Sequence, residues 1–491
     1  MTDATDQLKW LDPRTWEGCI YSNGWSVASE TIDVLEPATG AKLGHVGLAH
    51  AKDVAEAAQF ACRTQGIWAA MSYEARGAIL RSAAQLAEAN RQLFVDWLMR
   101  ESGSIRSKAE FEVSITIKAL HLAAAMPSQA SGQLLPSESG RLSIARKIPV
   151  GVVGVISPFN FPLYLAMRAV APALALGNAV LLKPDPRTAV SGGVLVARLF
   201  EAAGLPSGLL HMLPGGGDVG QAMCVDPNVH MIQFTGSSVA GRIVGRVAGE
   251  HLKKVSLELG GKNALIILDD ADLDLAVANA SWSVYLHQGQ ICMSAGRILV
   301  HARIVDEFSR RMAEKALALP MGDPMTDRVA LGPLVSAIQV EHALRVVNDS
   351  VAQGAKLLAG GTAQNLFFKA TVLGGVKPGM SAYNEEIFGP VAVITSFQND
   401  EEAIRLANDT EFGLSAAIIS NSIGRALAIG EKLKVGLLHI NDQTVNDDVV
   451  NPFGGVGASG NGTSIGGPAN WEQFTHWQWL TIKSAAPAYP L

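Results

Sequence analysis

The 491-residue chain has few cysteines, few charged residues and no long apolar run. Its four cysteines are far apart, without a Cys-x-x-Cys pair or a Cys/His cluster, so we expect neither a metal site nor a disulfide framework. Lys and Arg number 39 against 45 Asp and Glu and form no basic run, which argues against a nucleic-acid partner. The longest apolar stretch, 169–182, is interrupted by Pro172, Gly177 and Asn178, so we expect no membrane span and no membrane partner.

The chain does contain enough apolar sequence for a large core. Hydrophobic residues make up 48 % of it and charged residues 17 %. This apolar content argues against disorder, and the length favours two to four domains at roughly 100–200 residues each. The low charge indicates that part of the surface is buried in an oligomer. The first residues, MTDATDQLKWLDPR, lack the basic and apolar regions of a secretory signal, so we expect a cytoplasmic protein.

Short β-branched runs alternate with helical segments through most of the chain. In the first half, helices are predicted at 53–63, 74–100, 106–126, 188–203, 219–225 and 239–250, and strands at 148–156, 179–183, 209–213, 231–234 and 255–259. In a second half, from about 263 to 459, strands are predicted at 264–268, 297–300, 391–397 and 436–440, and helices at 273–288 and 401–407. Such alternation predicts βαβ units and a parallel sheet in an α/β fold. Segment 131–147 is predicted to be a protruding hairpin, and the tail 471–491 a strand-like segment docked on a neighbour.

Two glycine-bearing segments each lie between a predicted strand and a predicted helix. Segment 215–220, GGGDVG, fits G-x-G-x-x-G, in which glycine lets the backbone approach a pyrophosphate. The acidic residue expected at the end of the next strand is missing, so an ordinary glycine-rich turn is the alternative. Segment 234–241, FTGSSVAG, gathers hydroxyls and backbone N–H groups at a helix N-terminus, where anions bind. Its alternative is a plain Ser N-cap with a closely packed glycine.

Several reactive or polar side chains stand in unusual contexts. Glu258 ends an apolar strand before Gly-Gly and is either a general base, its pKa raised by burial, or a solvated strand-end carboxylate. Cys292 lies in a glycine-bearing loop and is either a nucleophile or an inert buried residue, whereas the other three cysteines are interpreted as packing residues. Asn160 lies at the C-terminal end of a strand, where α/β folds bind ligands, with an Asx turn as the alternative. Glu386 and Phe388 precede a Gly-Pro turn, and an exposed acidic turn is their alternative.

Together these segments resemble the motifs of the aldehyde dehydrogenase superfamily, in order and spacing, over about residues 30 to 480. The matching motifs are P-F-N-F-P at 158–162, K-P at 183–184, G-S-S-x-x-G at 236–241, L-E-L-G-G-K-N at 257–263, G-Q-x-C at 289–292, E-E-I-F-G-P at 385–390, Asn441, P-F-G-G at 452–455 and S-G at 459–460. Within the superfamily the chain is most similar to the NAD-dependent benzaldehyde dehydrogenases of aromatic degradation, with vanillin-type dehydrogenases as close competitors. The stretches that carry this narrower likeness are 181–185, 211–216, 441–443 and 487–490.

The resemblance implies a fold with three parts. These are a Rossmann-type cofactor domain (1–130 and 149–259), an α/β catalytic domain (260–460), and a small oligomerisation hairpin and tail (131–148 and 465–491). The hairpin and tail would leave apolar surface exposed on a monomer, so a homodimer or homotetramer is implied.

The resemblance also implies a reaction. Cys292 would attack the aldehyde carbon as a thiolate, while the Asn160 amide and the Cys292 N–H hold the oxyanion. Hydride transfer to a nicotinamide would convert the resulting thiohemiacetal to a thioester. Glu258 would activate water to release the acid, and because relatives that acylate coenzyme A typically lack this base, a free carboxylic acid is the implied product. A non-catalytic binding or structural relative is the remote alternative.

The implied cofactor is NAD, with NADP as the alternative. Lys183 would bind the adenosine ribose, Ser237 the pyrophosphate, and Glu386 and Phe388 the nicotinamide ribose and ring. The other implied cofactor contacts are Ile156, Ser157, Pro158, Gly215, Gly220, Phe234, Gly236, Gly241 and Leu259. Many NAD-preferring relatives place a Glu on the ribose hydroxyls where this chain has Pro186, so the preference for NAD rests on the subgroup alone.

The implied substrate pocket is apolar and aromatic. Its implied lining residues are Phe161, Tyr164, Leu286, Ile291, Met293 and Phe453. Such a tunnel suits a flat ring carrying an aldehyde, which makes benzaldehyde or a substituted benzaldehyde the expected substrate. Vanillin, salicylaldehyde and medium aliphatic aldehydes are the alternatives, and nearby Arg168 would tolerate a ring hydroxyl or carboxylate.

Overall fold

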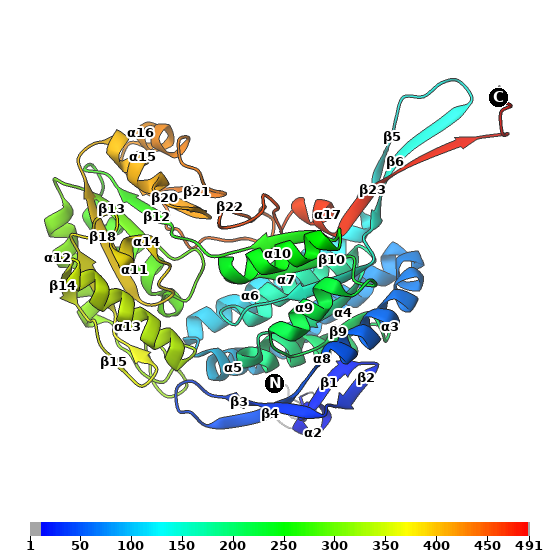
Figure 1. Cartoon of the computed structure of the whole chain (residues 1–491), viewed down its shortest axis with the longest axis horizontal. Coiled ribbons are helices and arrows are strands. Elements are labelled where there is room, and N and C mark those ends of the chain that lie inside the picture. Colours follow the sequence, from blue (N-terminus) through cyan, green and yellow to red (C-terminus); the bar gives the residue numbers. More distant parts are fainter. Residues whose placement is uncertain (1–10, 490–491) are drawn as a thin grey trace.

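In the computed structural model, which describes residues 11–489, two seven-stranded sheets form the centres of two lobes, and a third sheet forms a projecting arm (Figure 1). The first sheet has the order β11-β10-β7-β8-β9-β1-β2. Its strands are β1 (Cys19–Ser22), β2 (Gly24–Val27), β7 (Val152–Ile156), β8 (Ala179–Lys183), β9 (Leu210–Met212), β10 (Met231–Thr235) and β11 (Lys254–Glu258). The strands from β11 to β9 are parallel, and β1 and β2 extend one edge in antiparallel fashion.

Helices cover the first sheet and complete the first lobe. They are α3 (Ala51–Ala70), α4 (Tyr73–Ala89), α5 (Arg91–Ser102), α6 (Arg106–Ala125), α7 (Pro162–Ala175), α8 (Leu195–Ala202), α9 (Gly217–Val225) and α10 (Ser238–Glu250). Every residue of β7 and β8 is buried, which is why both strands are continuous apolar runs rather than alternating ones. The C-terminal ends of these parallel strands carry the glycine segments and Asn160, so the fold gathers them at one edge.

The second lobe surrounds the second sheet, which has the order β14-β17-β18-β13-β12-β20-β21. Its strands are β12 (Ala264–Ile267), β13 (Arg297–His301), β14 (Lys356–Ala359), β17 (Thr371–Gly374), β18 (Val391–Phe397), β20 (Ser415–Ile419) and β21 (Leu437–Ile440). Its helices are α11 (Leu273–Tyr285), α12 (Val305–Ala318), α13 (Ala337–Ala352), α15 (Asp400–Asn408) and α16 (Ile423–Gly430). Two apolar clusters form its core, and a separate cluster that includes Phe161, Ile291 and Phe453 lies where the lobes meet.

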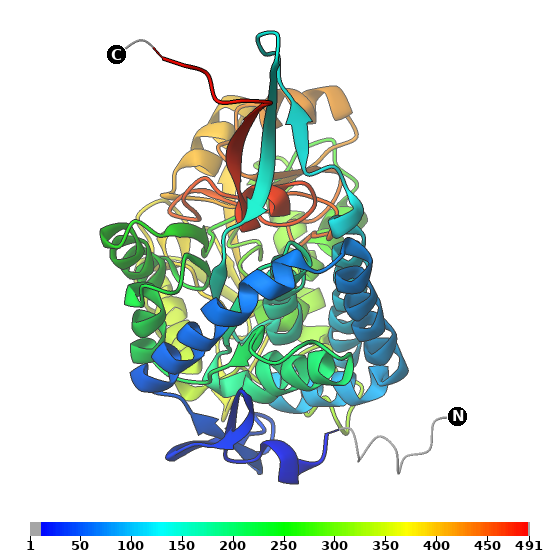
Figure 2. The same cartoon turned by 90° about the vertical axis from the view of Figure 1, so that its right-hand side faces the viewer.

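The arm is an antiparallel sheet made from two distant segments, β5 (Gly132–Leu134) with β6 (Arg141–Pro149), and β23 (Thr475–Lys483). Figure 2 shows that it projects from the body at the end opposite to β1 and β2. All nine residues of β23 pair with β6. The predicted hairpin is therefore confirmed. The predicted strand-like tail is confirmed for residues 475–483, which pair with the hairpin of their own chain, whereas residues 471–474 belong to a short helix, Ala469–Phe474.

Short elements complete the described chain. They are α2 (Pro13–Trp16), β3 (Glu30–Leu35), β4 (Lys42–Leu48), a 3-10 turn at Met126–Ser128, a 3-10 turn at Pro186–Thr188, a π turn at Val190–Val194, a 3-10 turn at Leu286–Gly289, β15 (Ala363–Gln364), β16 (Phe367–Phe368), α14 (Ser381–Asn384), β19 (Phe412–Gly413), β22 (Val456–Gly457) and α17 (Ala469–Phe474). The first ten residues of the predicted cofactor domain and the last two of the predicted tail lie outside the described residues. Within residues 11–489, no helix is both long and apolar enough to cross a membrane.

Several predicted helices differ from those observed. The predicted helix 74–100 is two helices, divided at Asn90, whose side-chain amide donates to the carbonyl of Leu86 at 2.8 Å. The predicted helix 273–288 ends at Tyr285, because Leu286 leaves the helical conformation (ψ 131°) and His287 and Gln288 adopt left-handed backbone conformations. Helix α7 was not predicted, since its residues are nearly all buried and Pro172 lies within it, so no 3.6-residue alternation marks it.

Candidate active site

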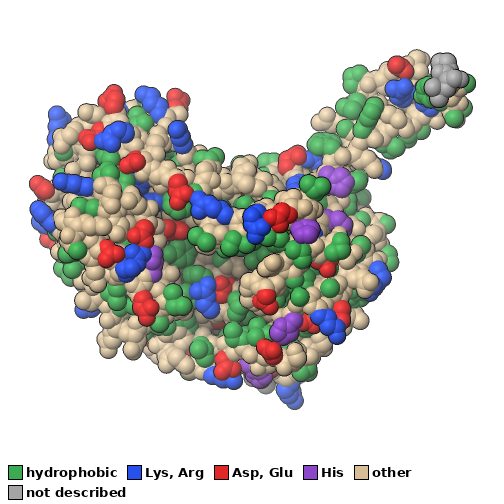
Figure 3. Space-filling view, viewed as in Figure 1, with side chains coloured by type: hydrophobic (Ala, Val, Ile, Leu, Met, Phe, Trp, Pro, Cys, Tyr) green, Lys and Arg blue, Asp and Glu red, His purple; other side chains and the backbone are tan. Residues whose placement is uncertain are grey.

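Two cavities meet where the lobes join, and Asn160, Glu258 and Cys292 border both of them. One has a volume of about 270 Å³ and the other of about 640 Å³. The space-filling view shows the surface hollowed in this region, between the lobes (Figure 3). Three residues that lie far apart in the sequence therefore share one junction, with a separate chamber on each side of it.

The loop that carries Cys292 follows α11 and is held by side chains from other segments. His287 and Gln288 have φ values of 49° and 56°, conformations that cost a non-glycine residue roughly 1–3 kcal/mol each. The Gln288 amide donates to the carbonyls of Gly103 at 3.0 Å and Pro333 at 2.8 Å. The Asn263 amide donates to the carbonyl of Cys292 at 2.8 Å. These bonds compensate for the unfavourable backbone and hold the thiol at the junction.

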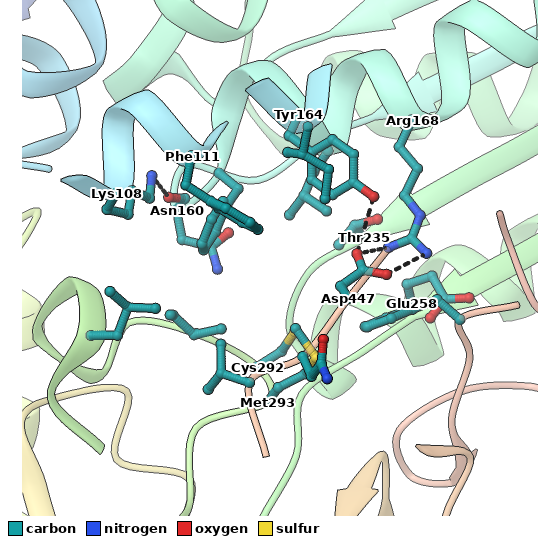
Figure 4. Close-up of a pocket in the computed structure, with 18 of the residues that line it drawn as sticks. Lys108, Phe111, Asn160, Tyr164, Arg168, Thr235, Glu258, Cys292, Met293 and Asp447 are labelled. Carbon is teal, nitrogen blue, oxygen red and sulfur yellow. Dashed lines mark hydrogen bonds and ion pairs between the residues drawn. The ribbon is translucent and has the colours of Figure 1, made fainter. Parts of the chain in front are cut away.

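Asn160 lies between the end of β7 and the start of α7, opposite the thiol. Its side-chain amide donates to the carbonyl of Gln290 at 2.9 Å, and because an amide has two N–H groups, one is left for a ligand. Among residues 11–489, the backbone N–H of Cys292 has no hydrogen-bond partner. Figure 4 shows the Asn160 amide and the Cys292 sulfur directed into the same cavity. Two N–H donors beside one thiol form the arrangement that stabilises an oxyanion.

Glu258, at the end of β11, is a buried carboxyl group that is 3 % exposed. Neither of its oxygens has a hydrogen-bond partner among the residues that the structure describes. Burial raises its pKa well above the ordinary value, while Arg168 opposes the shift and Asp447 adds to it. Burial, with a further contribution from Glu386, raises the pKa of the Cys292 thiol to about 12. The Cys292 thiol is consequently protonated at neutral pH. It lies beside a buried carboxyl whose raised pKa increases its affinity for a proton, as a general base requires.

Arg168, Asp447 and Tyr164 form a polar cluster in the wall of the smaller cavity (Figure 4). The Arg168 guanidinium donates to the two oxygens of Asp447 at 2.7 and 3.2 Å, and the Tyr164 hydroxyl donates to the same carboxylate at 3.1 Å. The guanidinium also lies 4.4 Å from the ring centroid of Phe453. Arg168 comes from α7 in the first lobe and Asp447 from the segment after β21, so this buried pair joins the lobes.

All six residues predicted to line the substrate pocket border the smaller cavity. They are Phe161, Tyr164, Leu286, Ile291, Met293 and Phe453. Phe111, Ile115 and Trp282 add further apolar wall. The chamber beside the thiol is therefore mainly apolar and aromatic, with the charged pair of Arg168 and Asp447 on one side.

The larger cavity runs past the N-termini of α9 and α10. The predicted cofactor contacts that border it are Ile156, Ser157, Pro158, Lys183, Gly220, Phe234, Gly236, Ser237, Leu259, Glu386 and Phe388. Gly215 and Gly241 do not border it. A Cβ at either position would lie 2.3 Å from a side-chain carbon, of Val219 or of Leu259, so both glycines serve close packing behind the wall. Gly217, by contrast, borders the cavity, and a Cβ at this position would meet no atom within 4 Å.

Charged groups lie at several places along the larger cavity. Burial lowers the pKa of Lys183. Glu386 accepts a hydrogen bond from the backbone N–H of Gly261 at 3.0 Å, and burial raises its pKa to about 7. A Cβ at Gly260 would lie 2.2 Å from a carboxylate oxygen of Glu386, so only glycine fits beneath it. One groove is thus lined by free N–H groups at helix N-termini, an amine, a hydroxyl and a carboxyl. The N–H groups and the amine suit the phosphates of a dinucleotide, and the carboxyl suits a ribose hydroxyl.

Three charged residues near the junction were missed by the sequence analysis. Lys108 and Glu112 lie on one face of α6, fully buried beside Asn160, but a Lys and a Glu four residues apart usually indicate an exposed helix face. Asp447 belongs to a loop without a motif. Arg168 was expected to tolerate a ring hydroxyl or carboxylate of the substrate, whereas the structure pairs it with Asp447. The position of an arginine in an apolar stretch is the one sequence signal that could have indicated a buried anionic partner.

The described geometry agrees with three comparisons with known proteins. Residues 25–480 match the model of the "Aldehyde dehydrogenase family". A vanillin dehydrogenase of Amycolatopsis sp. is 51 % identical over 98 % of this chain and 100 % of its own length, and a benzaldehyde dehydrogenase [NAD(+)] of Pseudomonas putida is 48 % identical over 97 % and 98 %. The crystal structure of a salicylaldehyde dehydrogenase from Pseudomonas putida G7, complexed with salicylaldehyde, superimposes with a TM-score of 0.93 at 34 % identity, covering 96 % of this chain and 99 % of that one.

Proposed function

Because the chain belongs to the aldehyde dehydrogenase family, we propose that it oxidises an aromatic aldehyde, benzaldehyde or a substituted benzaldehyde, to the carboxylic acid with NAD. The observation that carries this proposal is the junction of the two cavities. An apolar, aromatic chamber and a larger groove that runs past two helix N-termini meet at Cys292, Asn160 and Glu258. The names of the relatives, which refer to vanillin, benzaldehyde and salicylaldehyde, support an aromatic substrate.

In this proposal each residue at the junction has a separate catalytic role. Cys292 gives its thiol proton to solvent and attacks the aldehyde carbon as a thiolate, and the Asn160 amide and Cys292 N–H stabilise the negative oxygen of the adduct. Oxidation converts that adduct to a thioester on Cys292. Glu258 then removes a proton from water, which attacks the thioester carbon, so that the acid leaves and the thiol is restored. Because the pKa values of Glu258 and Cys292 are raised and the unprotonated forms react, the catalytic rate should increase as the pH rises.

The residues along the larger groove fit a bound dinucleotide. In this proposal Lys183 binds the adenosine ribose, Ser237 and the N-terminus of α10 bind the pyrophosphate, and Glu386 with Phe388 binds the nicotinamide end. When bound, NAD supplies the two-electron acceptor for the oxidation. NADP is the alternative cofactor, because Pro186 offers no carboxylate to repel a 2′-phosphate.

We propose that the chain is organised in three parts. Residues 1–130 and 149–259 form the cofactor domain, residues 260–460 form the catalytic domain, and residues 131–148 with 465–491 mediate oligomerisation as a homodimer or homotetramer. The arm supports this assignment, because Leu134, Trp477 and Trp479 are 74, 50 and 69 % exposed, an apolar surface that a second copy would cover. We propose a cytoplasmic enzyme that acts on a small molecule rather than on nucleic acid or membrane.

Steady-state NADH formation with benzaldehyde and with hexanal tests the substrate assignment. The apolar, aromatic chamber predicts a kcat/KM at least tenfold higher for benzaldehyde, which corresponds to about 1.4 kcal/mol. Repeating the assay with NADP compares the two cofactors. A preference for hexanal would contradict the aromatic assignment while leaving the catalytic residues in place, and no turnover of any aldehyde by protein that still binds NAD would contradict the enzymatic function itself.

A further inference from the structure

A buried ion pair on α6 lies directly behind the Asn160 loop. Lys108 Nζ is 2.5 Å from Glu112 Oε2, and both side chains have no exposed area. Moving two charges out of water is costly. Their mutual attraction offsets this desolvation cost only where further hydrogen bonds satisfy the remaining N–H groups and oxygen lone pairs. Both residues have such hydrogen bonds, and each of these bonds is to the backbone of Asn160 or of the first turn of the helix that follows it.

Lys108 contacts the residue that presents the oxyanion donor. Its ammonium group donates to the backbone carbonyl of Asn160 at 2.7 Å, the bond drawn in Figure 4. The same nitrogen lies 4.1 Å from the ring centroid of Phe161, the next residue. A charged hydrogen bond and a cation–π contact thus hold two consecutive residues of the loop.

Glu112 holds the other side of the same loop. Helix α7 begins at Pro162, and its N-cap residue, Phe161, has no side chain that caps the helix. Glu112 Oε1 instead accepts the backbone N–H groups of Leu163 at 2.9 Å and Tyr164 at 3.1 Å. A carboxylate from a neighbouring helix therefore satisfies the free N–H groups of the first turn and interacts favourably with the helix dipole.

We propose that Lys108 and Glu112 are positioning residues that fix the Asn160 amide for oxyanion stabilisation, an inference that rests on the proposed function. The side chain of Asn160 has one anchor of its own, the bond to Gln290, so the direction of its second N–H depends on where the loop backbone lies. A displacement of about 1 Å in a reacting group costs about 10²-fold in rate. Lys108 and Glu112 prevent that displacement by binding the backbone on both sides of Asn160.

The test variant is Lys108→Met/Glu112→Gln. It removes both charges together, so no unpaired charge is left buried, and glutamine keeps an oxygen that accepts the N–H groups of Leu163 and Tyr164. The matched control is Lys52→Met/Glu56→Gln on α3, a pair with the same spacing whose side chains are 84 and 65 % exposed. The bond to the Asn160 carbonyl is lost only in the first variant.

The measurement is a double-mutant cycle with Asn160→Ala, read as kcat/KM for the aldehyde. In the background that retains Asn160, we expect the buried-pair variant to lose about 10- to 100-fold. In the Asn160→Ala background the same change should cost less than about 3-fold, because the donor to be positioned is already gone. The exposed control should change neither background by more than about 2-fold, and the Kd for NAD should stay unchanged throughout.

Equal fold-losses in the two backgrounds would show that the pair supports the fold alone and would overturn the proposal, as would an unchanged kcat/KM when Asn160 is present. If the double variant does not fold, Glu112→Asp replaces it. Its carboxylate is one methylene shorter and cannot keep all of its contacts, so we expect a loss of about 3- to 10-fold that again vanishes without Asn160. The unaltered protein is assayed before any variant is made. If it does not oxidise aldehydes, that result contradicts the proposed function itself and is distinct from a failure of the positioning role.

Discussion

Replacement of Asp447 by alanine should destabilise the protein far more than loss of a surface ion pair. The side chains of Arg168 and Asp447 are 5 and 9 % exposed, and the Asp447→Ala variant leaves the guanidinium buried with one carbonyl, that of Ile465, as its remaining acceptor. Removing one partner of a buried pair costs about 3–5 kcal/mol. At about 2 °C per kcal/mol for a large domain, Tm should fall by about 6–10 °C.

Two further variants separate the effect of burial from the effect of charge. Arg246 and Glu250 form a pair of similar length, 2.6 Å, but their side chains are 64 and 55 % exposed, so Glu250→Ala should cost less than about 1 kcal/mol. The double variant Arg168→Met/Asp447→Leu removes both buried charges and should recover most of the Tm lost in Asp447→Ala, because apolar side chains replace a buried pair at little cost.

The assay is differential scanning calorimetry of the cofactor-free protein at one fixed scan rate, since large proteins often unfold irreversibly. Circular dichroism at 20 °C confirms that each variant is folded before heating. The reasoning is refuted if Asp447→Ala lowers Tm no more than Glu250→Ala does. It is also refuted if the double variant is as unstable as Asp447→Ala alone, because the loss would then come from packing rather than from an uncompensated charge.

Substitutions of Cys292 and Glu258 should affect different steps of the proposed reaction. Cys292→Ala should abolish aldehyde oxidation while NAD binding persists, and substantial residual NADH formation would disprove the covalent mechanism. Glu258→Gln should spare acylation but slow thioester hydrolysis by about 10²–10⁴-fold, visible in stopped flow as a burst of NADH followed by slow turnover. Because burial raises the pKa of Glu258 and the base must be unprotonated, the rate of the unaltered enzyme should rise with pH, and a rise of the same size in Glu258→Gln would exclude Glu258 as its source.

The sequence predicts the architecture best where the chain is regular. Strands such as β7, β8 and β10 are short apolar runs with turn residues after them, and the structure has all three. The predicted strand 148–156 is, however, divided at Gly151, where the φ value is 116°, between the end of β6 and β7. The projecting hairpin was predicted because segment 131–147 fitted neither lobe. The N-terminal strands β1 to β4 were not predicted, because they lack the clear apolar runs that mark buried parallel strands.

Motifs predict which residues gather at the site but not the conformations that hold them there. The glycines at 215 and 241 illustrate the difference, because both belong to motifs and yet pack behind the cavity wall instead of bordering it. The left-handed backbone at His287 and Gln288, which ends the predicted helix early, also leaves no mark on the sequence. Such conformations depend on tertiary bonds, here those of Gln288 to Gly103 and Pro333.

Two buried ion pairs near the junction hold helix α7, and no sequence motif indicates either pair. Glu112 caps the first turn of α7, and Arg168 on the same helix binds Asp447 from the other lobe. Helix α7 is therefore fixed at its start by its own lobe and further along by the opposite one. Asn160 lies two residues before this helix, and Cys292 belongs to the second lobe. In the proposed mechanism the two ion pairs therefore fix the position of the Asn160 amide relative to the Cys292 thiol.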